Sequence, residues 1–433
     1  MISATCWIRK GVAKQIPEKF ELDEEQYNKI LRSTKEEIQV AKRGLQDMET
    51  DPSLEKYKMD DYDDEGEEDA GKDFLFSNHT KLAYYENGDD DPYVKFHGEE
   101  ETDLEDLKIL PSDSLILAAR TEDDVSYLDV YVYEEENDNL YVHHDLMLPS
   151  FPICIEWIDY SSSETHGNLA AVGTFDPEIE VWDLDVLEAA CPKIILGQSS
   201  RKGKDKSKSR HVDAVMCLSW NAMHRNILAS GSADHTIKLW DIAAEAAVSS
   251  IDFHSGKVQA VEWNSFNSSV LLSGSYDRNV CVYDSRTPKD RKIWSMNSDI
   301  ECAKWNPQYE NIFAVSDESG LVQCYDIRKD EPLYNIHAHS KSTSSLDWNP
   351  YVPDFLLTGS TDQTLKLWNL HNNEAECIVS KDLGIGKVFS ASFSKDSPYL
   401  VSAAGSEGIM SIWNLCDVLK FKAKLDEKMN KDL

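Results

Sequence analysis

The sequence predicts an all-β fold, a seven-bladed β-propeller, and three observations support this prediction. Two separate sets of aromatic residues recur along the chain, and over most of it they keep the same period of 42 to 45 residues. Between the two aromatic positions of a repeat lies a strand-like run of small residues that leads into a tight turn, as in Leu228–Asp234. A period of this size is typical of propellers, in which each repeat forms one blade.

The aromatic positions define six of the blades. One set ends strand-like segments and consists of Trp157, Trp220, Trp263, Trp305, Trp348 and Phe393. The other set is followed each time by Asp or Asn and consists of Trp182, Trp240, Tyr283, Tyr325, Trp368 and Trp413. From Trp220 and from Trp240 onward, both sets step by 43, 42, 43 and 45 residues, so that six blades extend from Phe151 to Leu415.

A degenerate seventh blade precedes these six. Its expected strands are Leu115–Arg120, Leu128–Tyr133 and Leu140–His144. The last repeat stops after its third strand, and a circular array of sheets must close or leave a strand edge exposed. Because Ile2–Ile8 is apolar and rich in β-branched residues, we expect it to cross over as the missing fourth strand of the last blade.

The rest of the chain divides by composition. Residues 1–50 form an N-terminal extension, in which the strand at Ile2–Ile8 is followed by a helical pattern from Leu22 to about Thr50. Residues 51–106 are highly acidic and poor in apolar residues, which predicts a largely disordered linker. The propeller covers 107–415, and residues 416–433 have the amphipathic pattern of a short C-terminal helix.

Two repeats contain a set of polar residues that also occurs in nucleophilic triads. The sets are His211, Ser230, Asp234 and Trp240, and His339, Thr358, Asp362 and Trp368. A Ser–His–Asp triad is one interpretation. The other is a structural relay, in which Asp holds His, and His holds a strand hydroxyl and the Trp N–H. The recurrence of the set favours the relay, because a catalytic triad would not be duplicated at a period of 42 to 45 residues, and buried polar groups need partners.

No catalytic residue, cofactor site or metal site is predicted. The sequence contains no Walker, dinucleotide or calcium-loop motif, and its nine cysteines form no C-x-x-C pair. His143 and His144 are adjacent on an expected strand, where alternation would point the two rings to opposite faces. No run of eighteen apolar residues is present, so we expect no membrane span.

One basic segment stands out in a chain whose net charge is −35. Such a charge disfavours general binding to nucleic acid, so an RNA contact would have to be local. The segment contains Arg201, Lys202, Lys204, Lys206, Lys208 and Arg210, within an interval from Trp182 to Trp240 that is lengthened to 58 residues. It is interpreted as a flexible solvated loop, as a nuclear or nucleolar address, or as a local phosphate contact.

A second surface feature involves two arginines. Arg286 and Arg328 each lie two residues after an aromatic–Asp pair, in Tyr283–Arg286 and Tyr325–Arg328. This spacing resembles the box by which some propellers dock onto a cullin-ligase adaptor. The other interpretation is that these arginines are ordinary surface residues, because arginine is common where a strand exits to solvent.

Nearly the whole chain, including the repeats themselves, resembles the periodic tryptophan protein 1 family of WD40 propellers. The stretches that make the resemblance specific are Met1–Thr5, the acidic region, Ile109–Pro111, Tyr141–Asp145 and Ile179–Asp185. The resemblance implies a nuclear, largely nucleolar protein required for ribosome production, through assembly of large-subunit precursors and rRNA processing. It also implies an association with chromatin and with transcription of ribosomal RNA genes. The family has no known catalytic residues.

Three functional hypotheses therefore stand. The favoured one is a non-enzymatic scaffold that joins pre-ribosomal proteins, with an rRNA contact through the basic segment. The alternative is a chromatin-associated propeller whose acidic surface binds histones. A cullin-ligase substrate adaptor is the weaker third hypothesis. None of them involves a membrane, a small-molecule substrate or a cofactor.

Overall fold

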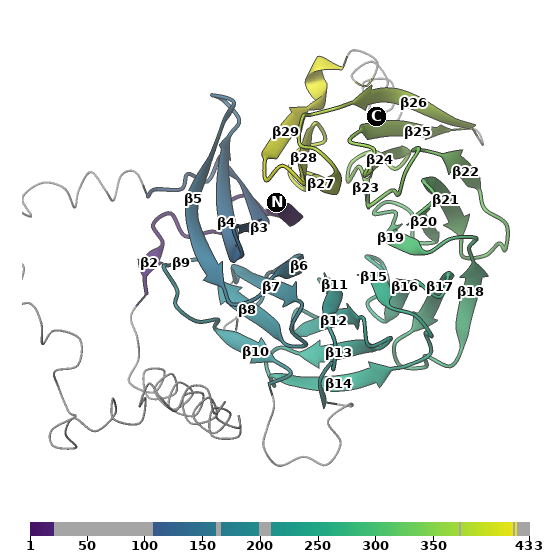
Figure 1. Cartoon of the computed structure of the whole chain (residues 1–433), viewed down its shortest axis with the longest axis horizontal. Helices are drawn as coiled ribbons and strands as arrows, with labels where there is room; N and C mark the ends of the chain where they lie inside the picture. Colours follow the sequence, from purple (N-terminus) through teal and green to yellow (C-terminus); the bar gives the residue numbers. More distant parts are fainter. Residues whose placement is uncertain (21–106, 162–165, 199–208, 372–373, 419–420, 422–433) are drawn as a thin grey trace, which may run out of the picture. The chain divides into compact units, whose positions relative to one another are not determined.

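The structure is a computed structural model, which describes residues 1–20, 107–161, 166–198, 209–371, 374–418 and 421. The elements of these residues are strands, apart from a 3-10 helix, η4, at Leu415–Asp417. Seven antiparallel sheets follow one another around a central axis (Figure 1). The predicted seven-bladed all-β propeller is therefore confirmed, and the sheets are called blades 1 to 7 in chain order.

The strands of the first three blades include one from the start of the chain. Blade 1 consists of β1 (Ile2–Ile8), β3 (Ser114–Glu122), β4 (Val125–Glu134) and β5 (Asn139–Leu148). Blade 2 consists of β6 (Pro152–Ile158), β7 (Leu169–Thr174), β8 (Ile179–Asp183) and β10 (Ile194–Leu196). Blade 3 consists of β11 (Val215–Trp220), β12 (Ile227–Ser232), β13 (Ile237–Asp241) and β14 (Ala246–Ile251).

The remaining blades follow the periodic repeats. Blade 4 consists of β15 (Val258–Trp263), β16 (Val270–Ser275), β17 (Asn279–Asp284) and β18 (Arg291–Ser295). Blade 5 consists of β19 (Ile300–Trp305), β20 (Ile312–Asp317), β21 (Leu321–Asp326) and β22 (Tyr334–His337). Blade 6 consists of β23 (Ser345–Trp348), β24 (Phe355–Gly359), β25 (Leu365–His371) and β26 (Glu374–Lys381). Blade 7 consists of β27 (Val388–Phe393), β28 (Leu400–Gly405) and β29 (Met410–Asn414).

The hydrophobic core lies between neighbouring blades. The cluster between blades 3 and 4, for example, joins Ile237 and Leu239 of β13 to Val258 and Trp263 of β15. The small residues of the second strands make this close packing possible. A Cβ atom added at Gly231 would lie 2.7 Å from a methyl carbon of Val258 in the next blade, so this position requires glycine.

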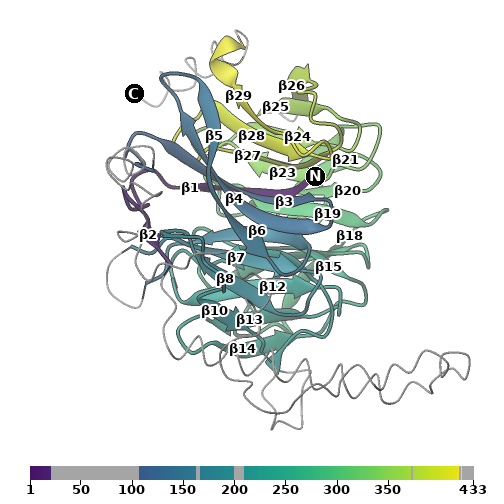
Figure 2. The same cartoon turned by 60° about the vertical axis from the view of Figure 1, so that its left-hand side comes forward.

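The expectation for Ile2–Ile8 is correct about the strand and wrong about its partner. This segment is β1, but it pairs antiparallel with β3 and is the innermost strand of blade 1. It also reaches both neighbouring blades, since Ser3 Oγ donates to Pro152 O at 2.7 Å and Trp7 Nε1 donates to Ser392 O at 3.2 Å. Figure 2 shows β1 between β3 and β27. The ring thus closes through the packing of β1 between blades 1 and 7.

Blade 7 has three strands among the described residues, β27 to β29. Phe421, beyond η4, is fully buried and packs its ring 4.9 Å from that of Phe355 in blade 6. The helix expected over 416–433 otherwise falls almost wholly outside the described residues. The helical pattern from Leu22 to Thr50 and the acidic linker 51–106 lie outside them as well.

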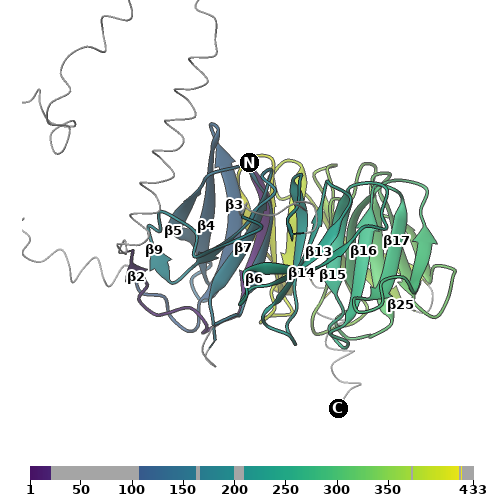
Figure 3. The same cartoon turned by 90° about the horizontal axis from the view of Figure 1, so that it is seen from below.

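A small element connects the N-terminal segment to the rim of blade 2. After β1 the chain forms β2 (Glu18–Lys19), which pairs in parallel with β9 (Val186–Leu187). Figure 3 shows this pair at the edge of the ring, seen from below. No helix in the part of the chain that the structure describes has the length and apolar character needed to span a membrane.

Candidate functional site

The polar set of blade 3 forms one continuous chain of hydrogen bonds. His211 Nδ1 lies 3.0 Å from Asp234 Oδ2, and His211 Nε2 lies 2.7 Å from Ser230 Oγ. Trp240 Nε1 donates to the same hydroxyl oxygen at 2.8 Å. The turn between β12 and β13 positions Asp234, whose Oδ1 accepts the backbone N–H of Thr236 at 2.9 Å. The loop before β11 thereby becomes joined to the second and third strands of the blade.

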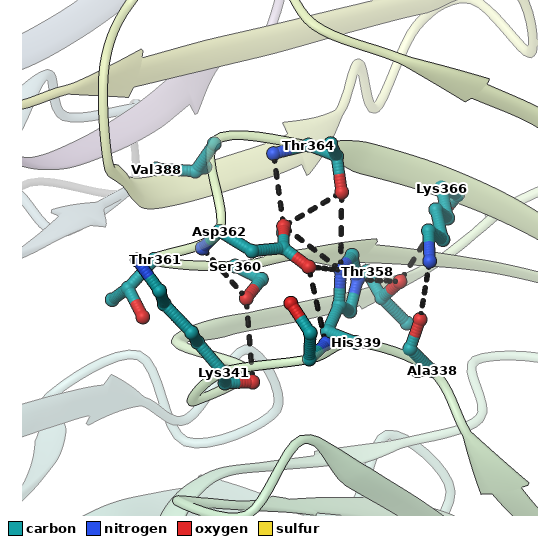
Figure 4. Close-up of polar contacts among 12 residues, drawn as sticks. Ala338, His339, Lys341, Thr358, Ser360, Thr361, Asp362, Thr364, Lys366 and Val388 are labelled. Carbon is teal, nitrogen blue, oxygen red and sulfur yellow. Dashed lines mark hydrogen bonds and ion pairs between the residues drawn. The ribbon is translucent and has the colours of Figure 1, made fainter.

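Blade 6 repeats this arrangement (Figure 4). His339 Nδ1 lies 3.1 Å from Asp362 Oδ2, and His339 Nε2 lies 2.7 Å from Thr358 Oγ1. Trp368 Nε1 donates to Thr358 Oγ1 at 3.1 Å, and the hydroxyl of Thr364 donates to Asp362 Oδ1 at 2.7 Å. The structure therefore brings together all four predicted residues in each of the two sets.

A third set occurs in blade 4, with one substitution. His254 Nδ1 lies 2.9 Å from Asp277 Oδ2, and His254 Nε2 lies 2.9 Å from Ser273 Oγ. Tyr283 stands where blades 3 and 6 have tryptophan, and its ring packs edge-on against Phe253 with a centroid distance of 5.0 Å. An aromatic side chain fills this place in all three blades, whether or not it supplies an N–H.

The protonation states follow from burial and charge. Burial lowers the pKa of His211 and of His339, and the neighbouring carboxylates oppose this effect only in part. Burial alone would raise the pKa of Asp362, but the bond from Thr364 and the nearby His339 lower it to about 2. The pKa of Asp234 is lowered in the same way. A neutral imidazole consequently donates from Nδ1 to an anionic carboxylate, and its Nε2 accepts the hydroxyl proton.

The bonds run in the order expected of a structural relay, from Asp to His to the strand hydroxyl and from the tryptophan N–H to the same hydroxyl. Ser230 and Thr358 are fully buried, so their hydroxyls have no approach for a substrate. Each hydroxyl oxygen also accepts a tryptophan N–H, which ties it to the third strand of its blade. The relay satisfies buried polar groups that would otherwise destabilise the fold.

Blade 5 solves the same packing problem without a His–Asp–hydroxyl relay. Met296 occupies the position that corresponds to His211, and Val315 the position that corresponds to Ser230. Met296 and Val315 belong to an apolar cluster with Trp294. Blade 5 has an apolar cluster where blades 3 and 6 have a relay, and all three blades are formed. We therefore interpret the relays as groups that stabilise the packing of their blades.

Four asparagines, which the sequence analysis did not single out, link successive blades. Each directly follows the aromatic residue at the end of an innermost strand, and its Nδ2 donates to a backbone carbonyl of the next blade. The pairs are Asn221 with Ser268 O at 2.7 Å, Asn264 with Glu310 O at 2.9 Å, Asn306 with Pro353 O at 2.7 Å, and Asn349 with Pro398 O at 2.9 Å. The repeated Trp–Asn dipeptide is the sequence signal that could have revealed them.

The two arginines of the proposed adaptor contact are both exposed and both paired. Arg286 Nη2 lies 2.6 Å from Asp284 Oδ2, and Arg328 Nη2 lies 2.6 Å from Asp326 Oδ2. The side chains of Arg286 and Arg328 are 74% and 70% exposed. They occupy equivalent places, directly after the third strands of blades 4 and 5.

The basic segment lies mostly outside the described residues. Of its six cations, Arg201, Lys202, Lys204, Lys206 and Lys208 fall within 199–208, which the structure does not describe. Arg210 is described and is partly buried immediately before His211. The segment therefore joins the loop that leads into β11.

The expectation that His143 and His144 point apart is wrong. Their Nδ1 atoms lie 2.8 Å from one another, because the pairing of β4 with β5 shifts register between Val130 and Tyr131. Burial lowers the pKa of His144 to about 4. Across the described residues no three or more His, Cys, Asp and Glu side chains are arranged to hold a metal ion, and all nine cysteines are free.

Comparison with known proteins identifies the repeats and several relatives of the whole chain. The family model "WD domain, G-beta repeat" matches residues 205–241, 246–284, 330–369 and 382–414. Periodic tryptophan protein 1 of Saccharomyces cerevisiae is 35% identical over 98% of this chain and 90% of its own length. The periodic tryptophan protein 1 homolog of Drosophila melanogaster is 31% identical over 94% of this chain and 92% of its own length. An uncharacterised WD repeat-containing protein of Schizosaccharomyces pombe is 41% identical over 96% of this chain and 89% of its own length.

Two more distant similarities extend over part of the chain. The ribosome biogenesis protein WDR12 homolog of Drosophila pseudoobscura pseudoobscura is 24% identical over 49% of this chain and 50% of its own length. Among solved structures, a chain of the mitotic checkpoint complex superimposes with a TM-score of 0.55, at 20% identity, over 71% of this chain and 84% of that chain. The latter similarity shows the fold alone.

Proposed function

Because the chain belongs to the periodic tryptophan protein 1 family of WD-repeat proteins, we propose that it is a non-enzymatic assembly platform in ribosome biogenesis. In this role it joins proteins within precursors of the large ribosomal subunit and supports rRNA processing. The nucleus, and within it the nucleolus, is the proposed location, because these precursors are made there.

The observation that carries the proposal is the contrast between the interior and the rims of the ring. The His, Asp and hydroxyl groups that could have performed chemistry are buried and bonded to one another in the relays. The rims instead present turns with exposed arginine and large apolar side chains. Rigid scaffolds with variable exposed loops commonly serve as binding platforms. The similarity to a ribosome biogenesis protein supports the choice of process.

Gradient sedimentation tests this proposal directly. The full chain with a C-terminal tag should cosediment with large-subunit precursors in nuclear extracts, and nuclease treatment of the extract should move it to light fractions. Depletion of the protein should also cause precursor rRNA of the large subunit to accumulate. Complete absence of the chain from precursor particles, with unchanged rRNA processing after depletion, would refute the proposal.

The basic segment supplies the proposed rRNA contact and nuclear address. Replacing its six cations by glutamine should reduce crosslinking to RNA, whereas replacing the exposed Arg278 on the ring should not. If all six cations met single-stranded RNA, the logarithm of the binding constant would fall with the logarithm of salt concentration at a slope of about −4. If the glutamine variant has an unchanged salt dependence of RNA binding and an unchanged nuclear location, this segment is neither the rRNA contact nor the nuclear address.

The net charge of −35 favours a second candidate function, binding of basic histone tails at chromatin. Binding that depends on acidic patches alone should disappear near half-molar salt, where the screening length is about 4 Å. A histone pull-down at graded salt therefore distinguishes this function from membership of a precursor particle, which is tested by sedimentation.

A further inference from the structure

Four large apolar or aromatic side chains lie in corresponding turns on one rim of the ring. They are Met223, Phe266, Tyr309 and Tyr351, here called the aromatic arc, and they are 54%, 48%, 45% and 48% exposed. Each lies in the turn between the first and second strands of its blade, in blades 3, 4, 5 and 6. Exposed apolar residues are unremarkable singly, but a series of them on one face is typical of an interaction surface.

The turns that carry the arc are held in place by the asparagines described above. Asn264 Oδ1 accepts the backbone N–H groups of Phe266 and Asn267 at 2.9 and 3.0 Å, while its Nδ2 bonds to the next turn at Glu310 O. The asparagines of the other three turns make the same bonds. Because each turn is anchored to its neighbour, the exposed side chains project from a preorganised backbone, which lowers the entropic cost of binding.

A shallow open pocket lies within the arc, at the junction of blades 4 and 5. Its volume is about 270 Å³, and its lining includes Phe266, Tyr309, Ile312 and Arg328. The first three side chains offer an apolar wall, which a Phe, Leu, Ile or Met side chain of a partner can fill.

Arg328 gives this pocket a defined electrostatic character. Asp326 beneath it is only 6% exposed, whereas the guanidinium is 70% exposed, so the pair presents its positive end to solvent. The bonds to Asp326 use Nε and Nη2, and Nη1 has no acceptor within the described residues. A guanidinium fixed in this way can receive a carboxylate without further ordering.

We propose that the aromatic arc and Arg328 form a docking surface for an extended segment of a partner protein, in which an acidic residue lies next to a bulky apolar one. The apolar side chain enters the pocket between Phe266 and Tyr309, and the carboxylate binds Arg328. The carboxylate of Glu310, at the rim of the same pocket, repels the acidic residue of the partner segment. That residue therefore lies on the side of the pocket where Arg328 is. This docking surface is a specific part of the proposed platform function, and the biological setting of its partner rests on that function.

A protein segment fits this surface better than RNA does. Binding of the RNA backbone relies on several unpaired cations. Among the residues that line this pocket Arg328 is the one cation, and Glu310 adds a negative charge. Met, Phe, Tyr and Arg are the residue types enriched where proteins bind proteins.

Selection from a random dodecapeptide library displayed on phage tests the proposal with the purified full chain. The library is first depleted on the Arg328→Gln, Phe266→Ser double variant and then selected on the unmodified chain. The enriched peptides should carry Asp or Glu within two residues of Phe, Leu, Ile or Met. A synthetic copy of the most enriched peptide should bind Arg328→Gln and Phe266→Ser at least tenfold more weakly than the unmodified chain.

Two matched variants sharpen the result. Arg278→Gln removes an exposed, carboxylate-paired arginine from the opposite rim, in the turn between β16 and β17, and should leave the affinity within twofold. Glu310→Gln removes the opposing charge and should strengthen binding at least twofold. Thermal melts establish that every variant is folded at the assay temperature, and Arg328→Gln, which loses its side-chain bonds to Asp326, is expected to melt somewhat below the unmodified chain.

Several results would overturn the proposal. They are the absence of enriched peptides, enrichment of basic peptides, equal binding to Arg328→Gln, or tighter binding of a fluorescent oligouridine that Arg328→Gln abolishes. The assay uses no ribosomal material, so its failure is distinct from that of the platform function. Absence of the chain from precursor particles would refute the latter and leave a measured peptide affinity standing.

Discussion

Replacing Asp234 by alanine should lower the free energy of unfolding by about 4 kcal/mol, because this carboxylate accepts four hydrogen bonds worth roughly 1 kcal/mol each. Oδ2 accepts from His211 Nδ1 and from the backbone N–H of Val212, both at 3.0 Å. Oδ1 accepts from the backbone N–H and the hydroxyl of Thr236, at 2.9 and 2.6 Å. The carboxylate side chain is only 5% exposed, so water cannot replace these bonds without opening the turn.

Urea denaturation followed by circular dichroism measures this loss. With a slope of about 3 kcal/mol per molar urea, the midpoint should fall by roughly 1 M or more. Asp213→Ala is the matched control, since the exposed Asp213 carboxylate accepts one short-range bond from Ala214 N and its loss should cost less than about 1 kcal/mol. The relay reasoning fails if Asp234→Ala costs no more than Asp213→Ala.

Three further predictions follow from the fold. Because the pKa values of His211 and His339 are lowered in the folded chain, unfolding takes up protons at these rings, and stability is lost as pH falls below their ordinary value of about 6.5. Between pH 6 and 5 the free energy of unfolding of the unmodified chain should fall by up to about 2.7 kcal/mol more than that of the His211→Gln, His339→Gln double variant. Parallel pH profiles of the two proteins would contradict this. Trp7→Ala should cost roughly 3–5 kcal/mol in the same urea assay, because Trp7 is 2% exposed between blades 1 and 7; a cost below about 1 kcal/mol would argue against closure by β1. Asn264→Ala removes three hydrogen bonds and should cost about 3 kcal/mol, whereas a near-neutral effect would show that the turns need no such anchor.

The blades could be predicted because their signal is local and repeated. Each repeat carries its own strand alternation and its own aromatic landmark, so Trp220 and Trp240 identify the same places as Trp348 and Trp368. The polar sets were recognisable for the same reason, since their spacing recurs from one repeat to another. Where a repeat lacks these residues, as with Met296 in blade 5, the sequence alone offered no comparable signal.

The partner of β1 could not be predicted from local pattern. An apolar strand such as Ile2–Ile8 suits either an inner or an outer place in a blade, and the choice depends on contacts with residues far away in sequence. Trp7 and its bond to Ser392 identify the inner place only in three dimensions. The contact between His143 and His144 was missed because a single register shift cancels the alternation of a regular strand.

The exposed surface was the least predictable part. The spacing from Tyr325 made Arg328 recognisable in the sequence, but the pocket beside Arg328 includes Phe266 from the preceding repeat. The Asn anchors that hold the turns were visible as Trp–Asn pairs, yet their bonding partners belong to the following blade. Features formed by residues of two blades can therefore be recognised only when the arrangement of the blades in the ring is known.

The position of β1 has a consequence for how the molecule is made. During translation Thr5 emerges from the ribosome 385 residues before Ser390, to which it bonds in the folded ring. During elongation β1 can pair with β3, but its flank that faces blade 7 stays unburied until β27 has been made. Nascent chains that stall before blade 7 would expose an apolar seam to neighbouring polypeptides, a situation that invites aggregation and makes chaperone protection valuable.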